Sequence, residues 1–390
     1  MDAAANQHRV FRRLLEDLRP HWRRDPGLPA RIQGLFATHR EFGSRDRRLY
    51  RELLYTTLRH LPWIEPHLVG AAEEAIRRVA WLAADTPATR PFRAAFATGE
   101  PPSGDRTELL PAWFRAHAPE LFLEPELSAQ LSRPPLWIRL QTDSPASVQA
   151  EFERLGWTLA PSGVLPEAFR VGSEVDVTRT DAWQEGRLEV QDLGSQLLLA
   201  TVAVSPGSRW LDACAGAGGK TLQLARLVGP RGAVEAFDIR PAALAELRRR
   251  ANRGGFSWVR TLTRLEPAAS YDGVLIDAPC SGSGTWRRAP HLKWVTSEAD
   301  VAAAAGRQLQ LLRDHAPRVR PGGQLVYSTC SLSRRENEQI AAAFLAEHPG
   351  YVPVPPTGTF GFQPAAGVGL TVWPARHDSD GFFVAAFRRR

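Results

Sequence analysis

Long apolar runs are absent from this sequence of 390 residues, although 43% of its residues are hydrophobic. A membrane-spanning helix needs roughly 20 consecutive apolar residues, and no stretch approaches that length. The first 40 residues also lack the apolar centre of a signal peptide. We therefore expect a soluble, cytoplasmic protein that has no membrane partner.

Cysteine and lysine are scarce as well. The three cysteines, Cys214, Cys280 and Cys330, do not form the CxxC spacing of zinc sites. We therefore expect no metal and a reducing compartment. Only two of the 49 basic residues are lysines, Lys220 and Lys293. Because a GC-rich coding sequence also enriches arginine, the arginine content alone is weak evidence for a nucleic-acid partner.

The distribution of charge along the chain is more informative than its net value of +7. Residues 1–60 contain 13 arginines against 7 acidic residues, whereas residues 151–200 carry an excess of 5 acidic residues. A basic segment of this kind attracts a polyanion such as a nucleic acid. A solvated face of a helix is the alternative explanation.

The length predicts two or three domains, because a chain of 390 residues exceeds one ordinary core. Residues 1–128 read as a helical domain: apolar residues recur every three or four positions from Val10 to Ile76. The character of the sequence changes near the prolines at 134 and 135, within a small α/β domain of residues 129–195. Its predicted strands are Leu136–Leu140, Ala168–Val171, Glu174–Thr178 and Arg187–Val190, with a helix that begins after Ser144.

Residues 196–390 alternate between strand-like and helical segments, which predicts an α/β domain with a Rossmann-like, doubly wound sheet. In such sheets ligands bind outside the carboxyl ends of the strands. The predicted strands are Arg209–Ala213, Ala233–Phe237, Trp258–Leu262, Gly273–Ile276 and Gln324–Tyr327.

A glycine-rich turn follows the first of these strands, in the segment Asp212–Thr221. Such a turn lets a ligand approach the backbone, and Asp238, 22 residues after Gly216, could accept from a ribose diol. Cys214 stands where a Walker A loop needs glycine, and Thr221 replaces the third glycine of a dinucleotide motif. A nucleoside cofactor without pyrophosphate, S-adenosyl-L-methionine, fits better. A tight turn with a chance aspartate is the alternative.

All three cysteines follow predicted strands of this one sheet. A single buried cysteine is most often a small core residue. Three cysteines at strand ends, with none elsewhere, instead indicate a site in which a thiolate acts as a nucleophile.

With these motifs the sequence resembles the RNA 5-methylcytosine methyltransferases of the RsmB/Sun type. The resemblance covers residues 191–390 well and the small α/β domain, which is then RRM-like, more weakly. The helical domain is only generally similar to the NusB-like RNA-binding module of some members. The matching residues are Asp212–Thr221, Asp277–Gly282, Arg288, Pro290, Trp294, Tyr327–Ser331, Glu336–Glu338, His377 and Asp380–Phe383.

The resemblance implies that Cys330 is the nucleophile, that Cys280 assists product release and that Asp277 holds the base. The family's loop usually reads Ala-Pro-Gly-Gly-Lys, and here Gly216 and Ala217 replace the first two residues. The implied cofactor-binding residues are Cys214, Ala215, Gly216, Ala217, Gly218, Gly219, Lys220, Asp238, Arg240 and Asp277.

The sequence thus predicts a monomeric enzyme that methylates carbon 5 of a cytosine in RNA, with ribosomal RNA as the expected partner. A transfer-RNA cytosine methyltransferase is an alternative within the same class. A non-catalytic RNA-binding factor of ribosome assembly is an alternative from another class, but it would have no chemical use for Asp277, Cys280 and Cys330. Methylation of DNA is disfavoured, because DNA enzymes use the Pro-Cys thiol and need no Ser-Thr-Cys.

Overall fold

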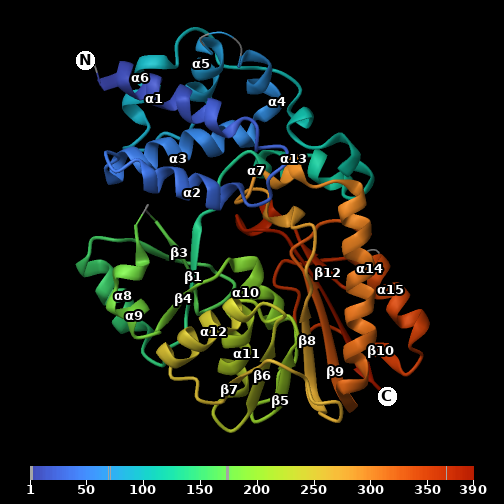
Figure 1. Cartoon of the computed structure of the whole chain (residues 1–390). Coiled ribbons are helices and arrows are strands. Elements are labelled where there is room, and N and C mark those ends of the chain that lie inside the picture. The colour runs from blue at the N-terminus through green and yellow to red at the C-terminus, as the bar shows by residue number, and fades with distance from the viewer. Residues whose placement is uncertain (1–2, 69, 71, 173–174, 366) are drawn as a thin grey trace. The chain divides into compact units, whose positions relative to one another are not determined.

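The computed structural model describes residues 3–68, 70, 72–172, 175–365 and 367–390 (Figure 1). The chain forms two compact units. The first comprises residues 1–132 together with residues 286–298, and the second comprises residues 133–285 and 299–390.

The first unit is helical, as the spacing of apolar residues predicts, and its described residues contain no strand. Phe11, Leu14, Leu15 and Leu18 are buried on one face of α1, because positions three and four apart share a helix face. The α-helices are α1 (Ala3–Leu18), α2 (Leu28–Thr38), α3 (Ser44–Arg59), α4 (Leu61–Ile64), α5 (Glu73–Leu82), α6 (Arg90–Phe96), α7 (Glu126–Gln130) and α13 (Leu292–Val295).

The segment 286–298 packs in the first unit although it follows the Cys280 loop in sequence. The Trp286 ring lies 4.6 Å from that of Phe114, measured between centroids. Lys293 is buried, and its Nζ donates to the carbonyl oxygens of Arg59, at 2.9 Å, and Leu109, at 3.0 Å. Burial, together with the charge of Arg59, lowers the pKa of Lys293 well below its ordinary value. The three consecutive domains predicted from the sequence assign this segment to residues 196–390, and that division stays a prediction.

The second unit contains an antiparallel sheet in the order β2-β3-β1-β4, formed by Leu159–Pro161, Ala168–Val171, Leu136–Leu140 and Leu188–Val190. Helices α8 (Pro145–Arg154) and α9 (Asp181–Gln184) complete this part. The predicted strand Glu174–Thr178 is wrong over its described residues, 175–178, and residue 174 lies outside them. The Asp176 carboxylate accepts from the backbone N–H of Thr178, which favours a 3₁₀ turn at Val177–Arg179 over a strand.

The larger sheet confirms the predicted Rossmann-like, doubly wound architecture. Its main path is β11-β12-β13-β9-β8-β5-β6-β7, and β10 pairs with β13. The strands from β9 to β7 run parallel, and β12 and β13 join antiparallel. Their bounds are Arg209–Asp212 (β5), Ala233–Phe237 (β6), Val259–Leu262 (β7), Tyr271–Asp277 (β8), Val319–Thr329 (β9), Tyr351–Pro353 (β10), Gln363–Pro364 (β11), Leu370–Val372 (β12) and Phe382–Arg389 (β13).

Helices cover both faces of this sheet (Figure 1). Leu197, Leu222 and Leu247 pack on one face from α10 (Leu193–Ala200), α11 (Gly219–Val228) and α12 (Pro241–Arg253). Leu312 and Phe344 pack on the other face from α14 (Glu298–His315) and α15 (Glu338–Glu347); α16 (Pro374–His377) precedes β13. Since β6 and β8 lie on opposite sides of β5, the strand order reverses at β5 and β8, where a ligand is expected.

Candidate active site

The carboxyl ends of the parallel strands carry the polar residues that the sequence predicts. The glycine loop follows β5, Asp238 follows β6, Asp277 ends β8 and Cys330 follows β9. The loop and Asp277 therefore flank the point where the strand order reverses.

The glycine loop has a backbone that requires glycine at two positions. Gly216 has a φ of 53° and Gly218 a φ of 93°, conformations that a side chain disfavours. A Cβ at Gly218 would also lie 2.2 Å from the Leu247 Cδ1 atom of α12. A Cβ at Gly219, where α11 begins, would meet no atom within 4 Å. Space for a ligand therefore lies beside the first residue of this helix.

Asp238 is buried, with 8% exposure, and its carboxylate contacts the glycine loop. Its Oδ2 accepts from the Gly216 N–H at 2.8 Å and from the Arg240 guanidinium at 3.0 Å. Hydrogen bonds from the Arg240 side chain, and then from backbone N–H groups, lower the pKa of Asp238, so the carboxylate is charged. An open loop beside a fixed carboxylate fits a nucleoside cofactor, provided that the exposed Arg240 side chain moves aside for a ribose.

The two cysteines after β8 and β9 lie together. The Sγ atoms of Cys280 and Cys330 are 3.4 Å apart, and both residues are free thiols. The hydrogen bond to Cys330, with burial, raises the pKa of Cys280 well above its ordinary value. A thiol with a raised pKa stays protonated, and either sulfur can be the donor of this hydrogen bond.

An ion pair joins the glycine loop to the β8 end. The Lys220 Nζ lies 2.8 Å from Oδ2 of Asp277, whose Oδ1 accepts from the Ser328 hydroxyl at 2.9 Å. Burial alone would lower the pKa of Lys220, but the charge and hydrogen bond of Asp277 outweigh it and raise this pKa. Lys220 also lies 5.1 Å from the centroid of the Phe382 ring. The lysine is thus a positioned cation rather than a solvated one.

Cys214 lies in the glycine loop, apart from the Cys280–Cys330 pair in sequence and hydrogen bonding. Burial and the neighbouring Asp212 raise the pKa of the Cys214 thiol, so it stays neutral. Burial also raises the pKa of Asp212 to about 7, while its carboxyl accepts from the Thr221 hydroxyl at 2.7 Å. The described residues contain no group of acidic, histidine and cysteine side chains suited to a metal ion.

Glu336 is a residue of this site to which the sequence assigns no role. It is fully buried, and its carboxylate accepts from the Ser281 N–H at 2.8 Å and the Ser331 hydroxyl at 2.6 Å. Gln308 of α14 donates to it at 3.1 Å. Because Ser281 follows Cys280 and Ser331 follows Cys330, one carboxylate holds both thiol-bearing loops. Its place in the Glu336–Glu338 motif was the only signal in the sequence.

A doubly wound sheet with a glycine loop after β5 and an acid after β6 defines a Rossmann-like methyltransferase fold. The described helices include none that is both long and apolar enough to cross a bilayer. The crystal structure of PH0851 matches with a TM-score of 0.75 and 24% identity, covering 94% of this chain and 95% of that one. A methyltransferase homologue from Pyrococcus horikoshii matches with a TM-score of 0.60 and 26% identity, covering 68% and 89% of the two chains.

The family of 16S rRNA methyltransferases RsmB/F matches residues 199–388, just under half of the chain, and the chain is similar to this family over those residues. Ribosomal RNA small subunit methyltransferase B of Xanthomonas campestris is 34% identical over 296 residues, 70% of this chain and 65% of that protein. The chain spans between 50% and 65% of the length of such curated relatives.

Proposed function

We propose that this protein is an S-adenosyl-L-methionine-dependent methyltransferase that modifies carbon 5 of a cytosine in ribosomal RNA. The pair of thiols 3.4 Å apart at the ends of β8 and β9 carries the proposal. Binding alone would have no chemical use for two such thiols. The family match and the names of the relatives support ribosomal RNA as the substrate.

The chemistry requires a nucleophile because carbon 5 of cytosine is itself too weakly nucleophilic. The Cys330 thiolate adds to carbon 6 of the base, and the electron pair moves to carbon 5, which becomes enamine-like. Bound S-adenosyl-L-methionine supplies the methyl group. Loss of the proton from carbon 5 then returns the electrons and expels the Cys330 thiolate.

The neighbouring residues have complementary roles in this proposal. The raised pKa of Cys280 keeps its proton, so Cys280 can stabilise the leaving thiolate through the sulfur–sulfur hydrogen bond. In this proposal Asp277, whose carboxylate accepts from Lys220 and Ser328, holds the edge of the base. Glu336 keeps the two loops together.

The test is a denaturation-resistant adduct between protein and RNA, made with labelled ribosomal RNA and S-adenosyl-L-methionine. Cys280→Ala should form the adduct and methylate once, then stall, because release is impaired. Cys330→Ala and the double variant should form no adduct yet still bind the cofactor. The reverse pattern would make Cys280 the nucleophile, and normal turnover by Cys330→Ala would refute covalent catalysis. Transfer RNA in the same assay tests the alternative substrate.

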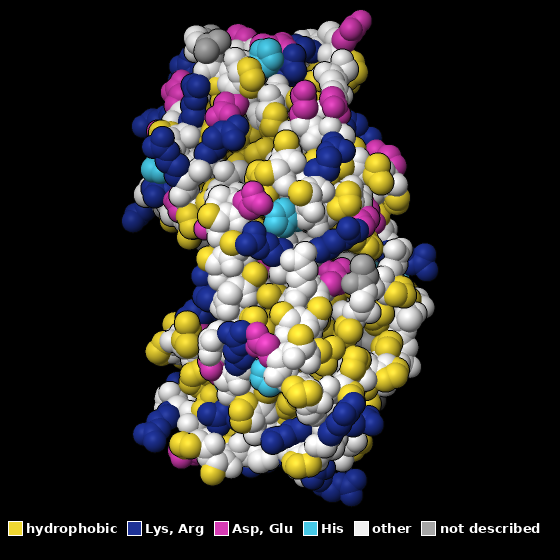
Figure 2. All heavy atoms as spheres, turned by 90° about the vertical axis from the view of Figure 1, so that its right-hand side faces the viewer, with side chains coloured by type: hydrophobic (Ala, Val, Ile, Leu, Met, Phe, Trp, Pro, Cys, Tyr) yellow, Lys and Arg dark blue, Asp and Glu magenta, His cyan; other side chains and the backbone are white. Residues whose placement is uncertain are grey.

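The site of RNA contact is proposed for the first unit, whose residues 1–60 are basic. A hollow of about 850 Å³ beside α1 is lined by Arg9, Arg12 and Arg13, but also by Glu16, Asp17, Glu41 and Asp46. This hollow is not itself a basic groove. The face drawn in Figure 2 likewise carries basic side chains in separate groups among acidic and apolar ones. Within this mixed surface the exposed side chains of Arg9 and Arg13, which line the hollow, are the proposed phosphate contacts.

A further inference from the structure

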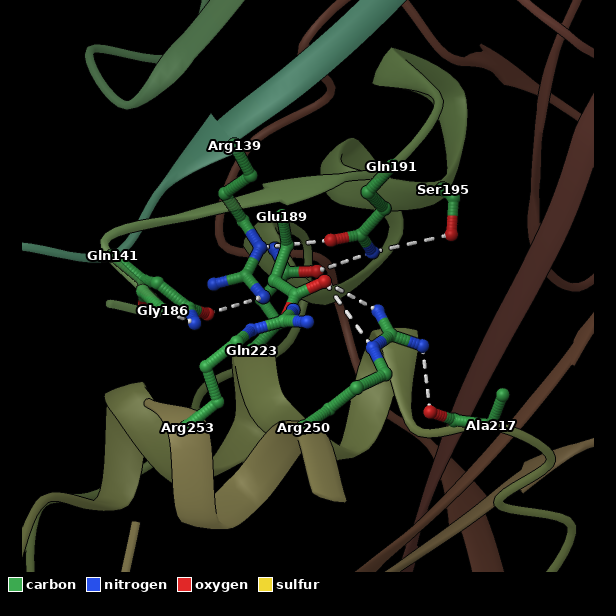
Figure 3. Close-up of polar contacts among 10 residues, drawn as sticks. All are labelled: Arg139, Gln141, Gly186, Glu189, Gln191, Ser195, Ala217, Gln223, Arg250 and Arg253. Carbon is green, nitrogen blue, oxygen red and sulfur yellow. Dashed lines mark hydrogen bonds and ion pairs between the residues drawn. The ribbon is translucent and has the colours of Figure 1, made fainter. Parts of the chain in front are cut away.

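A buried polar cluster connects the small sheet to the glycine loop within the second unit (Figure 3). Its centre is Glu189 of β4, only 2% exposed. Arg139 is the cross-strand neighbour of Glu189 on β1 and is 1% exposed. Arg250 and Arg253 reach Glu189 from α12, each with a closest distance of 2.7 Å. A carboxylate buried among guanidinium groups has its charge compensated from several sides.

The two arginines of α12 differ in a single respect that matters for the site. Arg250 donates to Glu189 through Nε and one terminal nitrogen, at 3.2 and 2.7 Å. Its other terminal nitrogen donates to the Ala217 carbonyl at 2.6 Å. Arg253 pairs with the same carboxylate, but its guanidinium then lies 3.8 Å from the centroid of the Trp183 ring in the small α/β part.

Ala217 is the residue of the glycine loop whose carbonyl accepts from Arg250. It lies between Gly216 and Gly218, whose positive φ angles leave the loop backbone permissive. Asp238 fixes the Gly216 N–H on one side, and Leu247 packs against Gly218 on the other. Arg250 lies one helical turn after Leu247 and donates to the carbonyl of Ala217, the residue between the two glycines.

We propose that Arg250 is a positioning residue for the glycine loop. Because Glu189 of the small sheet holds Arg250, the small sheet then contributes to the cofactor site. Glu189 accepts hydrogen bonds from Nε and one terminal nitrogen of Arg250. These bonds orient the guanidinium so that its other terminal nitrogen donates to the Ala217 carbonyl. The small α/β part thus pre-organises the loop before the cofactor binds. This inference rests on the proposed function, since it assumes that the loop binds S-adenosyl-L-methionine.

Arg250→Gln and Arg253→Gln form a matched pair, because both remove a charge from α12 and a partner from Glu189. Calorimetry with S-adenosyl-L-methionine should show affinity about tenfold weaker for Arg250→Gln, the scale of one lost charge-assisted hydrogen bond. Arg253→Gln should remain within about twofold of wild type, a margin well below that of a lost bond. Arg250→Lys should restore part of the loss, because its ammonium can still donate to the carbonyl.

A second readout needs no cofactor. Hydrogen exchange of residues 214–219 in the unliganded protein should be faster in Arg250→Gln than in Arg253→Gln, at equal unfolding temperature. Equal exchange and equal affinity in the two variants would overturn the inference. If wild-type protein binds no S-adenosyl-L-methionine while the two Gln variants still differ in exchange, the proposed function is refuted and the contact between Arg250 and the glycine loop stands. If either Gln variant is unstable, Arg250→Lys is compared with wild type in both measurements instead.

Discussion

Replacing Asp238 with Asn tests the cofactor site most directly, because the change keeps the size of the side chain and removes its charge. A hydrogen bond to a charged group contributes about 1.5–3 kcal/mol. The Asn amide oxygen remains a neutral acceptor, whose hydrogen bond contributes about 0.5–1.5 kcal/mol, so loss of the charge should weaken S-adenosyl-L-methionine binding by about tenfold. The structure adds a second loss, since Asp238 also accepts from the Gly216 N–H and from Arg240.

Arg240→Ala is the control for this prediction. It removes the exposed partner and leaves the acceptor in place; the Arg240 side chain is 67% exposed. Exposed ion pairs contribute about 0.2–1 kcal/mol, so affinity should change by no more than about fivefold. Both affinities are measured by calorimetry. Unchanged binding by Asp238→Asn would show that the ribose lies elsewhere, and a larger loss with Arg240→Ala would give the main contact to the arginine.

Three further predictions follow from the site and the first unit. Glu336→Gln should reduce turnover by about tenfold or more through loss of charge-assisted bonds to both thiol loops, with cofactor affinity unchanged; a calorimetric change would contradict this. The pKa of Asp212 is raised to about 7, so its protonated form favours folding and that contribution is lost as pH rises from about 4 to about 7. The thermal stability of Asp212→Asn relative to wild type should therefore increase from pH 5 to pH 8. A difference in stability that does not change with pH would contradict the raised pKa of Asp212. Double Gln substitution of Arg9 and Arg13 should lower the salt slope of RNA binding by about 1.5, whereas the pair Arg231 and Arg248 should not.

The main sheet and the site loops were predictable because their signals are local. Each parallel strand contains a few apolar residues close together in sequence, and the residues after it, such as Asp238 and Cys330, take their position from the end of the strand. The glycine loop could be placed for the same reason. The roles assigned to Cys330, Cys280 and Asp277 stay predictions, although the structure brings the two thiols within 3.4 Å.

The remaining features depend on contacts that a single sequence does not reveal. Helix α12 carries Arg248, Arg249, Arg250 and Arg253, and only the fold distinguishes the one that reaches Ala217. Glu189 is one acid among many in an acidic stretch. At 175–178 local hydrogen bonding by Asp176 overrides the β-branched pattern. The placement of residues 286–298 follows from packing with residues far earlier in the chain.

That placement has a consequence for the order in which the chain folds during synthesis. The helical unit is missing its last piece until residue 298 has left the ribosome, after β5, β6, β7 and β8 have been made. Until then Leu58, Arg59 and Leu109 have carbonyl groups without the donors that Trp294 and Lys293 later supply. A nascent chain released at Thr285 should therefore be protease-sensitive in residues 1–132, and a peptide of residues 286–298 should restore protection. Grafting the first unit onto another protein would require two separate stretches of sequence, not one.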